Sequence, residues 1–127
     1  KVQNSAARIA VGNYDYIGTR SADIIKELNW QTMNERSDFL LANLMYKCVH
    51  YLAPNYLCDN FTTLREINEY ETRSGSQNNL LIPKPNIEKF KESLVYKGAR
   101  IWNTLGASLH NASTLFQFKK LYKLMTI

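Results

Sequence analysis

The sequence predicts a small, mainly α-helical domain of irregular architecture, with a polar loop in the middle and little or no strand. Three observations lead to this prediction. Apolar residues recur at three- and four-residue steps near the middle and at the end of the chain. Residues that cap helices precede these stretches. A polar run of small residues separates them between residues 72 and 79. With 127 residues, 45% of them hydrophobic, we expect residues 1–127 to form a single module.

The first part of the chain contains the start signals of three helices. Residues 1–9 have an amphipathic pattern with no capping residue before it, so we expect a piece of a longer polyprotein. Ser21 is placed to cap a short helix that ends near Trp30. Thr32 and Glu35 have the spacing of a capping box, in which each side chain bonds the backbone amide of the other residue.

The helix after this capping box carries a stripe of apolar residues that we expect to face the core. Its members are Met33, Leu40, Leu41, Leu44, Met45, Cys48 and Leu52. The opposite face is expected to carry Arg36, Asn43, Lys47 and His50. Pro54 ends the helix, because proline disfavours the helical conformation in the residue before it.

Two helices are predicted to close the chain, after a short apolar segment at residues 80–82 whose length is too small to define its structure. The first runs from Leu94 to Leu105, and Tyr96, Lys97, Arg100 and Asn103 are expected on its outer face. Ser113 is placed to cap the second helix. The buried stripe of that helix is predicted to consist of Leu115, Phe118, Leu121, Tyr122 and Met125.

Positive charge is concentrated in the basic sub-region 84–127. The whole chain has a formal net charge of +5, yet residues 1–83 contain eight Lys and Arg against nine Asp and Glu. Residues 84–127 contain eight Lys and Arg against two Asp and Glu, and no acidic residue follows Glu92. Lys and Arg neutralise phosphates, and an exposed aromatic ring stacks on unpaired bases. The candidate nucleic-acid contacts are therefore Tyr96, Lys97, Arg100, Lys119, Lys120 and Lys123. The competing interpretation is that these lysines only make a helix surface soluble, while Trp102 belongs to the core.

Catalytic and metal chemistry have less support in the sequence. Glu69-Tyr70-Glu71 is the one acid-x-acid pattern, and we expect a solvated loop edge there rather than the metal site of a polymerase or nuclease. Cys48, His50 and Cys58 are too few for a structural zinc site, and we expect Cys48 to be a small core residue and His50 a surface residue. We assign this chain no catalytic residue, metal site or cofactor. Two cysteines, and no apolar run near the ~18 residues of a membrane span, favour a soluble intracellular protein.

Seven separated segments occur in an order that resembles the C-terminal region of non-LTR (LINE-type, jockey-like) retrotransposon reverse transcriptases, beyond the polymerase thumb. The segments are Gln3-Asn4-Ser5-Ala6-Ala7-Arg8-Ile9, Leu28-Asn29-Trp30 followed by Arg36, Tyr46-Lys47-Cys48-Val49-His50, Ala53-Pro54-Asn55-Tyr56-Leu57, Tyr70-Glu71-Thr72-Arg73, Ile101-Trp102-Asn103-Thr104-Leu105 and Phe118-Lys119-Lys120-Leu121. The resemblance covers nearly the whole chain. One departure is Gly106, which follows Leu105 where such tails typically have proline.

The resemblance implies a parent polyprotein that is an RNA-directed DNA polymerase with magnesium as its cofactor, acting in the cytoplasm and nucleus. The catalytic aspartates of that family would precede residue 1, so this chain would be an accessory module that is inactive alone. It would lie next to the upstream thumb and contact template RNA or an RNA–DNA hybrid through the nucleic-acid backbone. The alternative is a structural module that only packs on the thumb, or an inactive relic that binds no nucleic acid.

Overall fold

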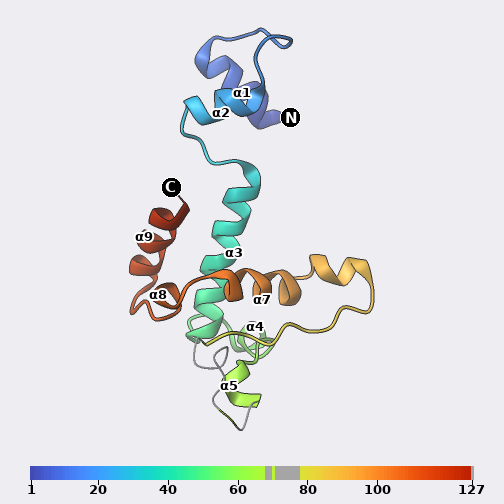
Figure 1. Cartoon of the computed structure of the whole chain (residues 1–127), viewed down its shortest axis with the longest axis vertical. Coiled ribbons are helices and arrows are strands. Elements are labelled where there is room, and N and C mark those ends of the chain that lie inside the picture. The colour runs from blue at the N-terminus through green and yellow to red at the C-terminus, as the bar shows by residue number, and fades with distance from the viewer. Residues whose placement is uncertain (68–69, 71–77, 127) are drawn as a thin grey trace. The chain divides into compact units, whose positions relative to one another are not determined.

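The computed structural model describes residues 1–67, 70 and 78–126, and confirms the mainly helical class (Figure 1). The elements are α1 (Val2–Val11), α2 (Ser21–Glu27), α3 (Met33–Val49), α4 (Asn55–Cys58), α5 (Leu64–Ile67), the 3-10 helix η1 (Glu88–Glu92), α7 (Leu94–Thr104), α8 (Ala107–His110) and α9 (Leu115–Thr126). In the described residues, extended pairing is limited to one antiparallel bridge between Thr63 and Leu80. Most of the predicted polar loop lies outside the described residues.

The chain divides into two compact units, residues 1–38 and 39–127, whereas the sequence predicted a single module. The boundary falls inside α3. The first unit has a small core of Ala7, Ile24 and Ile25, with Leu28 packed against it. The second unit contains the larger core and all the candidate nucleic-acid contacts.

Arg8 organises the first unit from a buried position. Its guanidinium group donates hydrogen bonds to the carbonyl oxygens of Asp15 (2.8 Å) and Thr19 (2.7 Å). It also donates to Oγ of Ser21 at 3.2 Å. Ser21 was expected to cap α2, but Arg20 is the N-cap residue, and the Ser21 hydroxyl binds Arg8 instead. The loop between α1 and α2 is thus held by one buried cation.

The capping box at the start of α3 is confirmed. The backbone amide of Glu35 donates to Oγ1 of Thr32 at 3.2 Å, and the amide of Thr32 donates to Oε2 of Glu35 at 2.8 Å. Two amides that helix geometry leaves without a partner are thereby satisfied. This start signal needs only residues within one turn, which is why the sequence revealed it.

The buried face of α3 differs from the predicted stripe. The residues buried on it are Phe39, Ala42, Asn43, Met45, Tyr46 and Cys48. Met33, Leu40 and Leu52 were expected to be inward, but all three are exposed. Asn43 was expected to be outward, and it is buried because its side-chain amide donates to the carbonyl oxygen of Phe39 at 2.7 Å. The face is set by two aromatic residues, Phe39 and Tyr46, that pack against α9.

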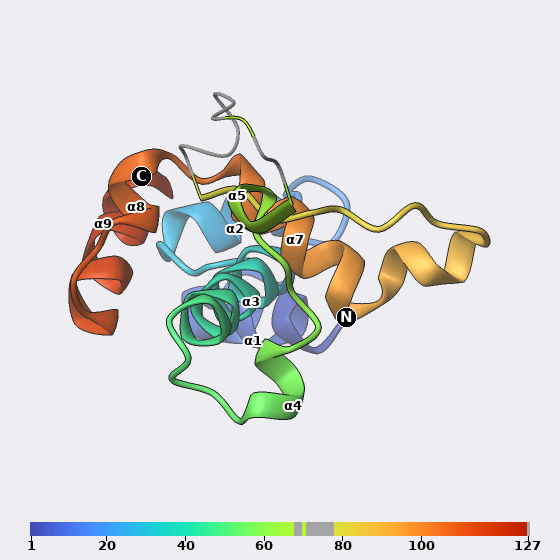
Figure 2. The same cartoon turned by 90° about the horizontal axis from the view of Figure 1, so that it is seen from below.

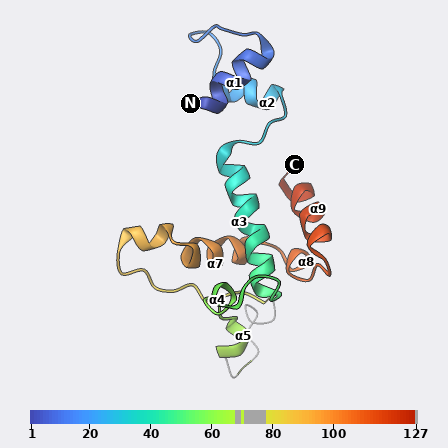
Figure 3. The same ribbon diagram turned by 180° about the vertical axis from the view of Figure 1, so that it is seen from behind.

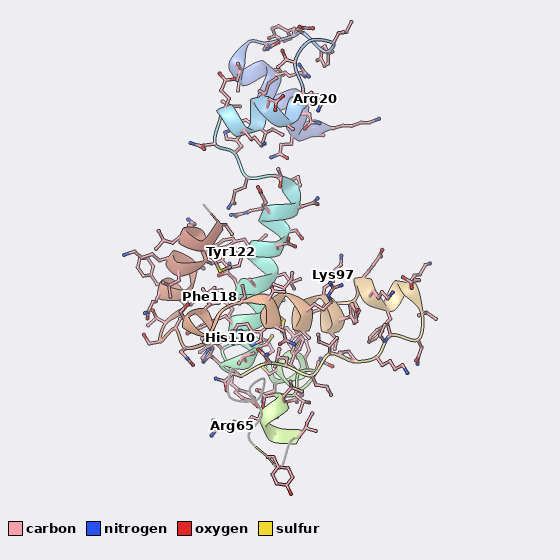
Figure 4. All side chains as sticks on the ribbon, in the orientation of Figure 1. Arg20, Arg65, Lys97, His110, Phe118 and Tyr122 are labelled. Carbon is pink, nitrogen blue, oxygen red and sulfur yellow. The ribbon has the colours of Figure 1, made fainter. Side chains whose placement is uncertain are left out.

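Aromatic rings from α3, α7 and α9 form the centre of the second unit (Figure 4). The ring centroids of Tyr46 and Phe118 are 4.8 Å apart, and those of Phe39 and Tyr122 are 5.4 Å apart. Trp102 of α7 is fully buried and stacks on Phe118, with 6.2 Å between centroids. The prediction that Trp102 belongs to the core is confirmed.

The end of α7 is tied to residues 78–80 by side-chain hydrogen bonds. Asn103 accepts from the amide of Leu80 at 2.7 Å and donates to the Leu80 carbonyl oxygen at 2.8 Å. The indole of Trp102 donates to the carbonyl oxygen of Asn78 at 3.1 Å. Asn103 was expected on the outer face, and it is half-buried because it satisfies both backbone groups of a buried residue.

A buried histidine closes the other side of this arrangement. The ring of His110 stacks on Trp102 with 4.4 Å between centroids, and its Nε2 lies 2.8 Å from the Trp102 carbonyl oxygen. A carbonyl oxygen only accepts, so Nε2 carries the hydrogen. α8 is thereby fixed to the last turn of α7, and the chain is directed into α9.

Candidate nucleic-acid interface

The outer face of α9 combines lysines with an aromatic ring. The helix begins after Thr114, whose Oγ1 accepts from the amide of Gln117 at 3.2 Å. Ser113 was expected to be this cap, but its hydroxyl instead donates to the side chain of Gln117 at 2.7 Å. Phe118 and Tyr122 are buried, whereas Met125, expected with them, lies in the last turn of the helix and is exposed. The exposed face carries Phe116, Lys119, Lys120 and Lys123.

This face has no acidic residue of its own. α9 contains no Asp or Glu, and none occurs after Glu92 in the chain. Side chains three and four residues apart are neighbours on a helix, so the charges of Lys119, Lys120 and Lys123 reinforce one another. Held close together, the three ammonium groups attract a polyanion more strongly than separate surface lysines do.

A second, smaller basic group lies on α7. Ser93 caps this helix by accepting from the Tyr96 amide at 3.3 Å, and Lys97 and Arg100 are exposed on the following turn. Lys97 projects away from the α7 ribbon (Figure 4). Glu88 and Glu92 belong to η1, which packs against α7. Lys89 and Lys91 also belong to η1, and Lys91 pairs with Glu88 at 2.8 Å, so η1 adds no net charge to the two cations of α7.

Tyr96 is not the open stacking platform that the sequence analysis expected. Its side chain is half-buried, and the Arg100 guanidinium carbon lies 5.8 Å from the centroid of its ring. The ring of Phe90 lies 6.4 Å from it in an edge-on arrangement. Neighbours on two sides already use the ring, so Tyr96 supports the position of Arg100 rather than offering a free surface.

The two basic groups do not merge into one surface. In the second unit, α9 and the first turns of α7 lie on opposite sides of α3, as three views agree (Figure 1, Figure 2 and Figure 3). The structure therefore brings together Lys119, Lys120 and Lys123 on one helix, and Lys97 and Arg100 on another. A single short ligand site that includes all five cations is not formed.

Phe116 is the residue that the sequence analysis missed. Its side chain is 79% exposed, in contrast to the buried rings of Phe118 and Tyr122 on the same helix. The signal was present in the sequence, because position 116 falls out of phase with the apolar stripe and in phase with Lys119, Lys120 and Lys123. An exposed aromatic residue among lysines is a feature that the apolar stripe does not explain.

The two cysteines form a buried pair. Cys48 and Cys58 are both buried and line one hollow together with Phe61 and Leu80. Burial raises the pKa of the Cys48 thiol to about 11, and the neighbouring Cys58 adds to this effect. His50 is exposed and lies against the Tyr46 ring, with 4.2 Å between centroids. Among the described residues, no three His, Cys, Asp or Glu side chains gather as metal ligands.

The remaining candidate carboxylates, Glu69 and Glu71, lie outside the described residues. In the part of the chain that the structure describes, no helix is both long enough and apolar enough to cross a membrane. Comparisons with models of protein families, with curated proteins and with solved structures each gave no significant match. The assignment of a function therefore depends on the ordered sequence motifs and on the surface of α9.

Proposed function

We propose that this chain is a C-terminal accessory module of a non-LTR retrotransposon reverse transcriptase, the RNA-directed DNA polymerase of the element. In this proposal it holds template RNA or an RNA–DNA hybrid for a polymerase site located upstream, and contributes no catalytic residue or cofactor ligand. The seven ordered motifs support the family assignment. The outer face of α9 supports the role in binding nucleic acid.

The observation that carries the role is the local charge of α9. Lys119, Lys120 and Lys123 are exposed within one helix that has no carboxylate. Each lysine that contacts a phosphate releases condensed counterions, so affinity falls with salt in proportion to the number of contacts. Such contacts hold the nucleic-acid backbone without reading its sequence. Lys97 and Arg100 would provide a separate, weaker anchoring point on α7.

The test is fluorescence anisotropy with the full chain, using a labelled single strand and an RNA–DNA hybrid over a salt series. We expect micromolar binding at low salt that weakens steeply as salt increases. Replacing Lys119, Lys120 and Lys123 by Ala should lower affinity equally for different sequences. The slope of log affinity against log salt should become shallower by about 2 units on a single strand, because each lost contact removes about 0.7.

A matched control separates local charge from total charge. Replacing Lys1, Lys26 and Lys47 by Ala also removes three exposed lysines and lowers the formal net charge from +5 to +2. The proposal requires the α9 variant to lose much more affinity and salt dependence than this control. Equal losses in both variants, or unchanged affinity in the α9 variant, would reject α9 as the interface.

The second candidate function is a structural module that packs on the upstream thumb. It is favoured by exposed apolar side chains in the second unit, among them Leu40, Leu52 and Leu124. A module of this kind, deprived of its partner, should associate with itself through its apolar surface. Sedimentation velocity on the folded chain distinguishes the two functions: self-association without nucleic-acid binding at low salt favours the structural module.

A further inference from the structure

We propose that Phe116 stacks on an unpaired base, so that α9 binds single-stranded nucleic acid in preference to duplex. This inference rests on the proposed function and deepens it, because it names the form of nucleic acid and a contact residue outside the predicted set. The proposed occupant of the α9 face is a single strand whose phosphates lie on Lys119, Lys120 and Lys123.

The position of Phe116 on α9 supports a stacking role. Lys119 and Lys120 are three and four residues further along α9, so their Cβ atoms are about 5–6 Å from that of Phe116. A base placed on the ring thus has ammonium groups one helical turn away. Lys123 continues the same face by one more turn. This alternation of an aromatic platform with cations is the arrangement that binds single strands without sequence preference.

The other aromatic residues near the basic groups are already used. Trp102, Phe118 and Tyr122 are buried in the core, and Tyr96 is flanked by Arg100. The ring of Phe116 is mostly exposed, and a phenyl group gains nothing from water. Base faces in a duplex are covered by neighbouring base pairs, so only an unpaired base offers a surface to this ring.

The test compares Phe116→Ala with the unmodified full chain on three probes: a single strand, the same strand made abasic, and a duplex of the same sequence. On the single strand we expect affinity to fall about five- to tenfold, at the lower end of the effect of removing one stacking residue. The salt slope should stay unchanged, because Phe116 contacts no phosphate. Binding to the abasic strand and to the duplex should stay within about twofold of the unmodified chain.

Two further variants distinguish stacking from simple apolar contact. Phe116→Trp should keep or increase single-strand affinity, whereas Phe116→Leu, which is apolar without a π face, should behave like the Ala variant. Tyr56→Ala is the matched control, since Tyr56 is an exposed aromatic residue of α4, next to Asp59 rather than lysines. It should bind every probe as the unmodified chain does. Circular dichroism verifies that each variant is folded.

The outcomes separate this inference from the proposed function. If the lysine variant loses binding while Phe116→Ala binds the single strand normally, the stacking role is wrong and the phosphate role stands. Restoration of affinity by Phe116→Leu, or an equal loss on single strand and duplex, also overturns stacking. If the unmodified chain binds none of the probes at low salt, both proposals fail. An apolar protein partner then becomes the better occupant of the α9 face.

Discussion

Replacing Asn103 by Ala should destabilise the second unit, although the side chain is only half-buried. The side chain makes two hydrogen bonds, of 2.7 Å and 2.8 Å, to the amide and carbonyl of Leu80, a residue that is 1% exposed. An unsatisfied buried donor or acceptor costs about 1–3 kcal/mol. Loss of both partners should therefore lower the free energy of unfolding by roughly 2–4 kcal/mol, allowing for partial access of water.

The assay is urea unfolding followed by the fluorescence of Trp102, the residue next to Asn103. A Trp30→Phe background removes the other tryptophan, so that the signal reports the second unit alone. Asn86→Ala, in an exposed segment, is the control and should change stability by less than about 0.5 kcal/mol. The backbone amide of Leu80 should also exchange with solvent faster in the Asn103 variant.

Asn103→Asp sharpens the test. A carboxylate keeps the bond from the Leu80 amide but has no hydrogen to donate to the Leu80 carbonyl oxygen. The Asp variant should therefore be least stable, relative to the unmodified chain, when its carboxyl is ionised. Because the ionised group is disfavoured in the folded chain, its folded pKa lies above the ordinary carboxyl value of about 3.9. Stability should recover as pH falls through that raised pKa and the group becomes a donor, and the recovery should be complete below about 3.9. If Asn103→Ala is within about 0.5 kcal/mol of the control, the idea that Asn103 anchors residues 78–80 is refuted.

Three further predictions concern buried groups. Arg8→Lys keeps the charge, but a single ammonium group cannot reach all three acceptors that the wider guanidinium group bonds. Hydrogen exchange of the backbone amides in residues 13–21 should therefore accelerate at least tenfold. Unchanged exchange would contradict the role of Arg8 in holding this loop. Gly98→Ala places a methyl group against Sδ of Met45, and this side chain has little room to move because it is 0% exposed. Overpacking of about 1–3 kcal/mol should therefore outweigh the helix-propensity gain of about 1 kcal/mol and lower the Tm, and a higher Tm would contradict this prediction. A pKa raised from 9.0 to about 11 lowers the fraction of Cys48 present as thiolate at pH 8 about a hundredfold. Iodoacetamide should therefore label Cys48 far more slowly in the folded chain than in urea, as measured by mass spectrometry.

The sequence predicted the elements better than their faces. The capping box of Thr32 and Glu35, the helix that begins at Leu94 and the exposed lysines of α9 were all recognisable. Some errors concern apolar residues, since Met33, Leu40 and Leu52 were placed inside and are exposed. Two others concern asparagines: Asn43 and Asn103 were placed outside because asparagine is usually exposed. Both are buried or half-buried since each bonds a backbone group, and for Asn103 that group is 23 residues away.

The candidate site was predictable in its cations and not in its aromatic contact. Lysines on the outer side of an amphipathic helix stay exposed whatever the helix packs against. The state of Tyr96 instead depended on Phe90 of η1 and Arg100 of α7, whose placement around the ring requires contacts between these two helices. Phe116 was recognisable from its position on the lysine face of the helix. An apolar residue next to a buried stripe in the sequence is nevertheless easily assigned to the core.

By itself, the sequence determined where the longer helices α3 and α7 begin, which class of fold the helices make and where the positive charge gathers. These properties depend on interactions within about one helical turn and on composition, so they do not require a known partner. Only the tertiary structure decided that the chain divides within α3, that Phe39 and Tyr46 rather than Leu40 face the core, and that Tyr96 is half-buried beside Arg100. Burial depends on contacts between distant residues, such as the Tyr46 hydroxyl and the Ala112 carbonyl oxygen, which are 66 positions apart and 2.8 Å from each other.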